Sequence, residues 1–175
     1  KAVFATTVHP DVVKRCPFER FWFNNLYDDP TEPRSLTAAF HFMSGKKTAL
    51  VTGGTVGFFI VNLAYYLEAN PIILLGYDYS YDDLDITKST YYNAYLATCK
   101  GDKAEVKKYF SIRKNPVFNN YYLFDLMWKA YRDIFAFYVN KMPVKVINAT
   151  EAGSLHPPEV KVECMKFKDA LERYG

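Results

Sequence analysis

Three short polar segments hold the residue types that can do chemistry in this chain. The first is Thr52-Gly53-Gly54-Thr55, the second centres on Asp78, and the third begins at Asn148. Glycine lets backbone amides approach an anion closely, and the first turn of a helix adds the positive end of a dipole. An Asp at the end of a strand is the type of residue that holds a ribose hydroxyl or a metal ion in α/β folds. Phosphate, ribose and metal binding are therefore the chemistries to consider first.

The glycine segment has two interpretations. Gly53, Gly54 and Thr55 would bind phosphate through backbone amides if the segment joins a strand to a helix. The alternative is a tight turn that needs glycine only because its backbone adopts positive φ. The pattern is neither GxGxxG nor a P-loop with its lysine, so spacing alone leaves both interpretations open.

Asp78 also has two interpretations, since it can bind a ribose or a metal, or only form a turn. The tyrosines around it can stack on a base or sugar, or pack on the core of the domain; they are Tyr77, Tyr79 and Tyr81. The acidic residues within 82–85 are expected to form a solvated loop, because magnesium sites use one or two carboxylates together with phosphates.

The third segment contains Asn148, Thr150 and Glu151, followed by Ser154. Glu151 can serve as a general base or orient a ribose, whereas the alternative is that Thr150 and Glu151 only cap the following loop. His156 is expected to be a loop residue rather than a catalytic base. No basic residue is fixed near the three segments by the sequence; the nearest are Lys46, Lys47, Arg113 and Lys114, which can equally be solvated.

The elements that position these segments alternate between strand and helix patterns. Strand patterns cover residues 2–7, 18–24, 48–51, 71–75 and 144–147. Helix patterns cover residues 12–15, 35–43, 55–68, 117–139 and 165–173, with short helices expected within 91–100 and 102–110. This alternation predicts an α/β domain with a mainly parallel sheet and helices on both faces, in which ligands bind beyond the carboxyl ends of the strands.

Some elements carry a more specific prediction. Asp11 is expected to cap the first helix, and Asn115 is expected to cap the long helix that ends at residue 139. The helix at 55–68 is apolar on more than one face and should be largely buried. The continuous apolar run 71–75 predicts a central parallel strand covered on both faces.

Composition limits the class of protein. The chain has 175 residues and a formal charge of +3, from 22 Lys and Arg against 19 Asp and Glu. This charge is too mild for a dedicated nucleic-acid binder, while acidic small molecules fit it as partners. The three cysteines lack a CxxC pair, which predicts neither a zinc site nor a disulfide framework and fits a reducing cytoplasm. No apolar run reaches the roughly 18 to 20 residues of a membrane span.

Three ordered motifs resemble those of the MptE-like family. They are Gly53-Gly54-Thr55-Val56-Gly57, then Pro71-Ile72-Ile73-Leu74-Leu75-Gly76-Tyr77-Asp78, then Asn148-Ala149-Thr150-Glu151-Ala152-Gly153. The family includes archaeal 6-hydroxymethylpterin diphosphokinases and is similar to the motility-accessory-factor flagellin glycosyltransferases. The resemblance implies a Rossmann-like three-layer sandwich that binds ATP with Mg²⁺ for pyrophosphoryl transfer, or an activated CMP-sugar for glycosyl transfer to a small-molecule or glycan acceptor.

Roles follow from the resemblance by position. Asp78 and Glu151 would be the catalytic groups, and Asp78 would also bind Mg²⁺. The nucleotide-binding residues would be Gly53, Gly54, Thr55, Asn148 and Thr150. Ser154 is added to them because its turn is rich in backbone and hydroxyl donors.

The chain departs from the family pattern in three places. The family's first strand normally ends in a GxGPSL-type turn, which has no counterpart upstream of Ala2. Ala152 replaces a family glycine, and Tyr77 stands where Gln is common. We therefore expect a single domain over residues 1–175 that lacks an N-terminal strand and the Gly-rich loop of the family. The competing interpretation is a noncatalytic accessory or nucleotide-binding α/β domain that has lost this first phosphate loop.

Overall fold

The structure is a computed structural model that describes residues 1–45 and 49–175. Lys46, Lys47 and the start of the strand predicted at 48–51 lie outside the described residues. The described chain is a mixed α/β fold with small, mainly parallel sheets, and it divides into two compact units, Lys1–Leu63 and Ala64–Gly175. The three-layer Rossmann-like sandwich and the single-domain organisation both stay predictions.

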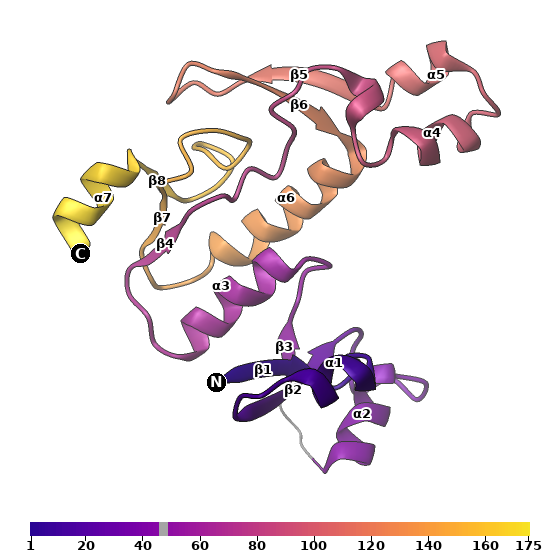
Figure 1. Cartoon of the computed structure of the whole chain (residues 1–175), viewed down its shortest axis with the longest axis vertical. Helices are drawn as coiled ribbons and strands as arrows, with labels where there is room; N and C mark the ends of the chain where they lie inside the picture. The colour runs from indigo at the N-terminus through magenta and orange to yellow at the C-terminus, as the bar shows by residue number, and fades with distance from the viewer. Residues whose placement is uncertain (46–48) are drawn as a thin grey trace. The chain divides into compact units, whose positions relative to one another are not determined.

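The first unit contains a parallel three-stranded sheet in the order β1-β2-β3 (Figure 1). Its strands are β1 (Ala2–Ala5), β2 (Arg20–Leu26) and β3 (Ala49–Val51), and its connections contain α1 (Pro10–Arg15) and α2 (Leu36–Ser44). Ala2 pairs with Arg20, and Asn24 pairs with Ala49, so the strands run side by side in sequence order. These strand and helix predictions are confirmed, with boundaries shifted by a few residues.

The helix caps of the first unit explain where its helices begin and end. The Asp11 cap prediction is wrong, because the N-cap is His9, whose Nδ1 accepts a hydrogen bond from the Asp11 amide at 3.3 Å. Asp11 instead lies in the first turn, where its negative charge interacts favourably with the positive end of the helix dipole. Ser35 caps α2 through its hydroxyl, and Gly45 ends that helix in the left-handed region at φ 66°.

Helix α3 (Val56–Tyr66) follows β3 through the glycine segment. Phe58 and Val61 are buried, whereas Val56 and Ile60 are exposed on the other faces of the helix. The prediction of a largely buried helix is therefore wrong. An apolar composition on several faces does not determine how many of those faces have a neighbour to pack against.

The second unit contains a parallel sheet in the order β4-β7-β8, formed by β4 (Ile72–Leu74), β7 (Val146–Asn148) and β8 (Glu163–Cys164). The prediction of a central strand at 71–75 is wrong, because β4 lies at the edge of this sheet and Ile73 keeps 36% of its surface exposed. The central strand is β7, which is buried along its whole length. The sequence patterns did not predict β8.

The predicted long helix at 117–139 is wrong over its first half. An antiparallel hairpin of β5 (Phe110–Lys114) and β6 (Tyr121–Asp125) precedes α6 (Leu126–Val139) (Figure 1). Asn115 closes the hairpin turn, since its Oδ1 accepts hydrogen bonds from the amides of residues 117 and 118. The N-cap of α6 is Asp125, whose Oδ1 accepts from the Trp128 amide at 2.7 Å. Residues 121–124 are aromatic and apolar, which suits a half-buried strand.

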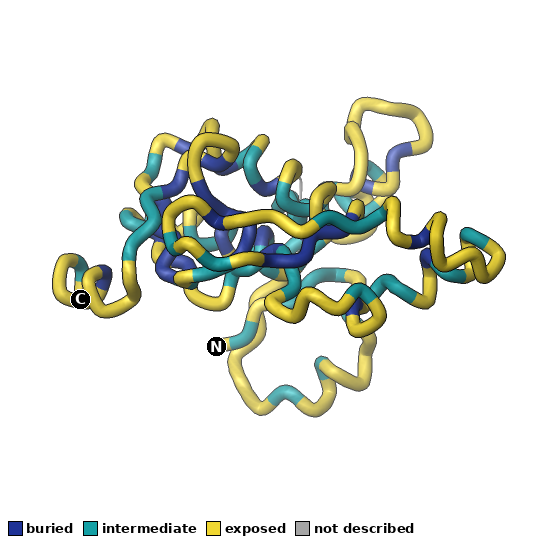
Figure 2. Tube along the Cα trace, turned by 90° about the horizontal axis from the view of Figure 1, so that it is seen from above, coloured by how far each residue is buried: buried dark blue, intermediate teal, exposed yellow. Residues whose placement is uncertain are grey.

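The remaining helices are η1 (Ile86–Lys88), α4 (Tyr92–Thr98), α5 (Lys103–Lys107) and α7 (Phe167–Tyr174). The predictions of two short helices and of a C-terminal helix are confirmed. Figure 2 shows that the C-terminal helix is exposed over most of its length. In the parts of the chain that the structure describes, no helix is long and apolar enough to cross a membrane.

Candidate functional site

The glycine segment of the first unit forms a tight turn between β3 and α3. Gly53 and Gly54 both lie in the left-handed region, at φ 56° and 76°, which a side chain would strain. The Thr55 amide donates to the Thr52 carbonyl at 3.0 Å, and the Thr55 hydroxyl accepts from the Phe58 amide at 3.1 Å. The Thr55 amide and hydroxyl are therefore used within the turn, and the phosphate-binding role of Gly53, Gly54 and Thr55 stays a prediction.

In the second unit, the carboxyl ends of β4 and β7 bring the predicted polar residues together. We call Asp78, Asn148, Thr150 and Ser154 the strand-end cluster. The Thr150 hydroxyl accepts from the Tyr77 amide at 3.0 Å, and Asn148 Oδ1 accepts from the Thr150 amide at 3.0 Å. Asn148 also donates its side-chain amide to the carbonyl of residue 155 at 2.7 Å. The Thr150 bond links the loop after β4 to the loop after β7, and the two Asn148 bonds hold the loop after β7 in shape.

Ser154 and Gly153 complete this connection. The Ser154 amide donates to the Asp78 carbonyl at 2.8 Å, and its hydroxyl reaches the carbonyls of Asp78 and Tyr79 at 3.2 and 2.9 Å. Gly153 lies at φ 77°, and a Cβ there would come within 2.6 Å of the Asp78 Cα and closer still to its carbonyl oxygen. Only glycine fits between the two loops at this point.

The side chains of Asn148 and Ser154 are fully buried and are used in these bonds. Thr150 is half-buried and also bonded. In this geometry the three side chains fix the backbone of the loops rather than extend toward a ligand. Their nucleotide-binding role stays a prediction, and it would act through the backbone that they hold in place.

Asp78 is the member of the strand-end cluster whose side chain is least constrained. Its carboxyl group is half-buried, and burial, with a smaller contribution from the charge of Asp82, raises its pKa. A nearby cation would reverse this effect, because opposite charge favours the ionised carboxylate. Across residues 1–45 and 49–175, no group of three or more His, Cys, Asp and Glu side chains could hold a metal ion. One or two carboxylates do, however, fit the manner in which proteins bind Mg²⁺, with water and phosphate as the other ligands.

Glu151 does not join Asp78. It is exposed, it lies in the left-handed region at φ 63°, and its Oε1 accepts from the Phe167 amide at 2.9 Å, at the first turn of α7. The negative charge of the carboxylate thus interacts favourably with the positive end of the α7 dipole. Its catalytic role stays a prediction.

The tyrosines of the loop after β4 pack on α6. The ring of Tyr79 lies 5.2 Å from Phe135 and 5.8 Å from Trp128, and Tyr81 lies 6.1 Å from Trp128, between ring centroids. Tyr77 is 6.5 Å from Phe135. The geometry fits the core-packing alternative better than stacking on a base. The acidic loop is exposed, as predicted, and Asp83 pairs with Lys88 at 2.6 Å.

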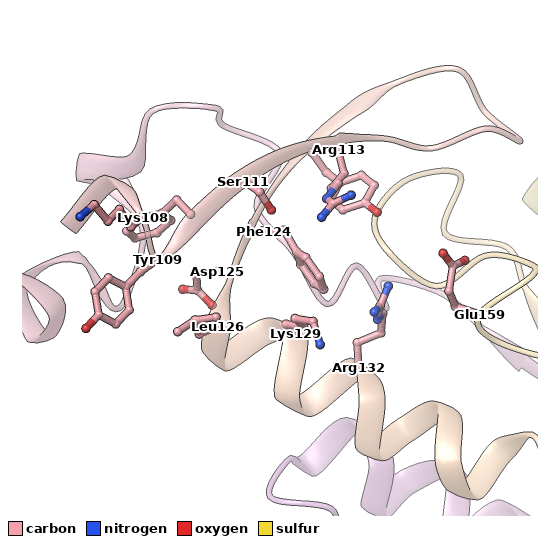
Figure 3. A pocket seen from close by; sticks show the side chains of 12 residues that line it. Lys108, Tyr109, Ser111, Arg113, Phe124, Asp125, Leu126, Lys129, Arg132 and Glu159 are labelled. Atoms are coloured by element: carbon pink, nitrogen blue, oxygen red, sulfur yellow. The ribbon is translucent and has the colours of Figure 1, made fainter. Parts of the chain in front are cut away.

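The sequence patterns missed a pocket of about 330 Å³ between the β5-β6 hairpin and α6 (Figure 3). It is lined by charged and aromatic residues, among them Arg113, Tyr122, Phe124, Lys129 and Arg132. The signal that could have found it is the alternation of side chains along the hairpin strands, which places these residues on one shared face. A helical interpretation of the same residues hides that alternation.

Residues 1–84 match the model of the family described as 6-hydroxymethylpterin diphosphokinase MptE-like. This match confirms the resemblance for the first two motifs, whereas the motif at 148–153 lies outside the matched residues. No curated protein and no solved structure matches the chain.

Proposed function

We propose that this chain is a diphosphokinase-like or related transferase domain that takes its transferred group from a nucleotide donor. The observation that carries the proposal is the family match over residues 1–84, because it covers both the glycine turn and Asp78. Pyrophosphoryl transfer from ATP is the leading reaction, and glycosyl transfer from a nucleotide-sugar is the related one.

In this proposal the glycine turn binds phosphate. Two glycines with positive φ allow the backbone to approach an anion, and the first turn of α3 adds the positive end of its dipole. The Gly54 amide would meet the charge that develops on the transferred phosphate oxygens. Thr55 holds the turn and the helix start in the required shape.

Asp78 would hold Mg²⁺, which neutralises phosphate charge when it is bound. The bonds from Ser154 fix the Asp78 backbone and so fix the point at which its side chain leaves the loop. Its raised pKa means that burial disfavours the ionised carboxylate, and the charge of a bound cation would offset this cost.

One observation favours a second candidate, a noncatalytic accessory or nucleotide-binding domain. The side chains of Thr150 and Ser154 are used to join the two loops, and the side chain of Asn148 is used within the loop after β7. A domain that keeps the fold without catalysis would need only this role from them.

Calorimetric titration of the chain with ATP, CMP and CDP, each with and without Mg²⁺, tests both candidates. Binding of ATP that requires Mg²⁺ supports diphosphokinase-like chemistry, and a preference for cytidine nucleotides supports glycosyl transfer. Turnover of ATP to AMP with a pterin acceptor, or its absence despite binding, separates the transferase from the noncatalytic domain. No binding by folded protein would refute the proposal.

Matched variants test the two assigned residues separately. Gly54→Ala should weaken ATP binding, whereas Gly45→Ala, at a similar φ of 66°, imposes comparable backbone strain away from the turn and should not. Asp78→Asn should remove the Mg²⁺ dependence, whereas Asp83→Asn removes the same charge from an exposed ion pair in the same loop. Equal effects within either pair would remove that residue from the site.

A further inference from the structure

We propose that the pocket between the β5-β6 hairpin and α6 binds the phosphate group of a small phosphorylated molecule. The pocket belongs entirely to the second unit, and it contains none of the residues that the proposed function uses. It also lies outside residues 1–84, to which the family match is confined.

One face of the hairpin forms the upper wall in Figure 3. Arg113 pairs with Tyr122, and Ser111 pairs with Phe124, in the antiparallel register. Side chains two residues apart on a strand point to the same face, and paired residues are neighbours across it. All four therefore project from one side of the hairpin, and all four line the pocket.

One face of α6 forms the opposite wall. Leu126, Lys129 and Arg132 follow one another at intervals of three residues, which places them along one side of the helix. Arg132 lies over the ring of Phe124, with its Cζ 5.0 Å from the ring centroid. In Figure 3, Arg113 and Arg132 lie at the same end of the pocket, one from each wall, with Glu159 beyond them.

Positively charged side chains from both walls line the pocket. Its lining contains four cations, Lys108, Arg113, Lys129 and Arg132, against the carboxylates of Asp125 and Glu159. Lys108 pairs with Glu105, and Lys129 and Arg132 both pair with Asp133, so three of these cations already have a carboxylate partner outside the lining. Among the described residues, Arg113 is the cation of the lining without an ion pair, and it is the one that an anionic group would meet.

The two carboxylates also have partners. Asp125 is buried and accepts from the Trp128 amide and, at 3.0 Å, from the Tyr81 hydroxyl. Glu159 Oε2 lies 3.8 Å from Nδ1 of His156. Neither carboxylate forms an ion pair with the arginines among the described residues.

The arginines differ in how they are held. Arg132 donates twice to Asp133, at 3.1 and 2.8 Å, which fixes its guanidinium, and its side chain is only 13% exposed. Arg113 makes no ion pair within residues 1–45 and 49–175, so its planar donors are available to an oxyanion. A guanidinium can donate two parallel hydrogen bonds to one phosphate, a geometry that a lysine ammonium does not provide.

The aromatic wall is preorganised. Tyr122 is buried, and its hydroxyl is 3.3 Å from Nε2 of His156. Burial raises the pKa of Tyr122, while the charges of Arg132 and Arg113 lower it, so the hydroxyl lies within the field of both guanidinium groups. A volume of about 330 Å³ is near the lower end for ligand sites, which fits a phosphate attached to a single ring.

Titration of the folded chain with phenyl phosphate, followed by NMR or calorimetry, tests this proposal. The matched variants are Arg113→Met and Lys114→Met, because they remove equal charge from adjacent residues of β5 that point to opposite faces. We expect Arg113→Met to weaken binding about 10- to 100-fold, as for the loss of a charge-assisted hydrogen-bond pair, and Lys114→Met to change it less than about twofold. Similar affinities for the two variants, or no saturable binding to folded wild type, would overturn the proposal.

Two further ligands identify the chemistry. Inorganic phosphate should bind more weakly than phenyl phosphate and be sensitive to the same variant, whereas benzoate should bind at least about tenfold more weakly. Benzoate binding as tight as that of phenyl phosphate would refute the assignment to phosphate. Gly54→Ala should leave phenyl phosphate affinity unchanged, so a failure of this proposal is distinguishable from a failure of the proposed nucleotide site.

Discussion

Replacing Gly153 with alanine tests whether the close contact between the loops after β4 and β7 holds the second unit together. The new Cβ would overlap the Asp78 backbone, and the φ of 77° would itself be strained. Relief of the overlap requires movement of the Asp78 carbonyl, which accepts hydrogen bonds from both the amide and the hydroxyl of Ser154.

The expected loss of stability has two parts. An alanine in the left-handed region costs roughly 1–2 kcal/mol. The loss of two hydrogen bonds costs about 1 kcal/mol each, so the total is about 3–4 kcal/mol. Gly76→Ala is the matched control, because Gly76 has a φ of 74° in the same unit but a Cβ there would contact nothing within 4 Å. It should lose only the strain, about 1–2 kcal/mol.

Urea unfolding measures both variants. In a Trp22→Phe background, fluorescence reports Trp128, which packs against Tyr79 and Tyr81 in the second unit. We expect the midpoint of Gly153→Ala to lie well below that of Gly76→Ala at equal m-value. Equal midpoints for the two variants would refute the claim that the loop contact, rather than φ alone, requires glycine.

Two more predictions concern hydrogen bonds that the structure shows. Burial, with a smaller effect of Asp125, raises the pKa of Tyr81 to about 12. Between pH 10 and about 12 the unfolded chain should therefore lose the Tyr81 proton before the folded chain does, so stability falls as pH rises through this window. Because the pKa of Tyr91 is also raised to about 12, absorbance titration of Tyr81→Phe should show this late step reduced by one tyrosine relative to wild type, and an unchanged titration curve would contradict the assignment. Ser35→Ala should destabilise the first unit by about 1 kcal/mol, because it removes the hydroxyl that caps α2, which circular dichroism during thermal unfolding can detect. A stability equal to that of wild type would show that the Asp28 carboxylate, which accepts from the Leu36 and Thr37 amides at the start of α2, is a sufficient cap.

Local sequence patterns predicted elements whose signals are local. The helix pattern at 35–43 predicted α2, and a strand pattern followed by two glycines predicted the turn into α3. The predictions that were wrong involve segments in which two local signals compete. Asn115-Pro116 resembles a helix start, but Asn115 is buried in a hairpin turn and donates to the Gly153 carbonyl. The start signal that the helix uses is Asp125.

The candidate site was also predictable from the sequence only in part. The rule that polar residues gather at the carboxyl ends of parallel strands predicts from the sequence that Asp78, Asn148, Thr150 and Ser154 lie together. It does not indicate that Asn148 and Ser154 are fully buried and bonded to backbone atoms. It also does not indicate that Glu151 reaches α7 instead.

The sequence by itself determined the α/β class, the family resemblance, and the positions at which strands end in polar residues, because these depend on residue types close together in the chain. Only the tertiary structure decided which strand is central, which polar side chains are consumed by loop contacts, and which charged residues share a pocket. Arg113 and Arg132 lie 19 residues apart in the chain, Arg113 on β5 and Arg132 on α6. They line one pocket because the β5-β6 hairpin folds back toward α6. That juxtaposition depends on register and packing between distant segments, which no local pattern contains.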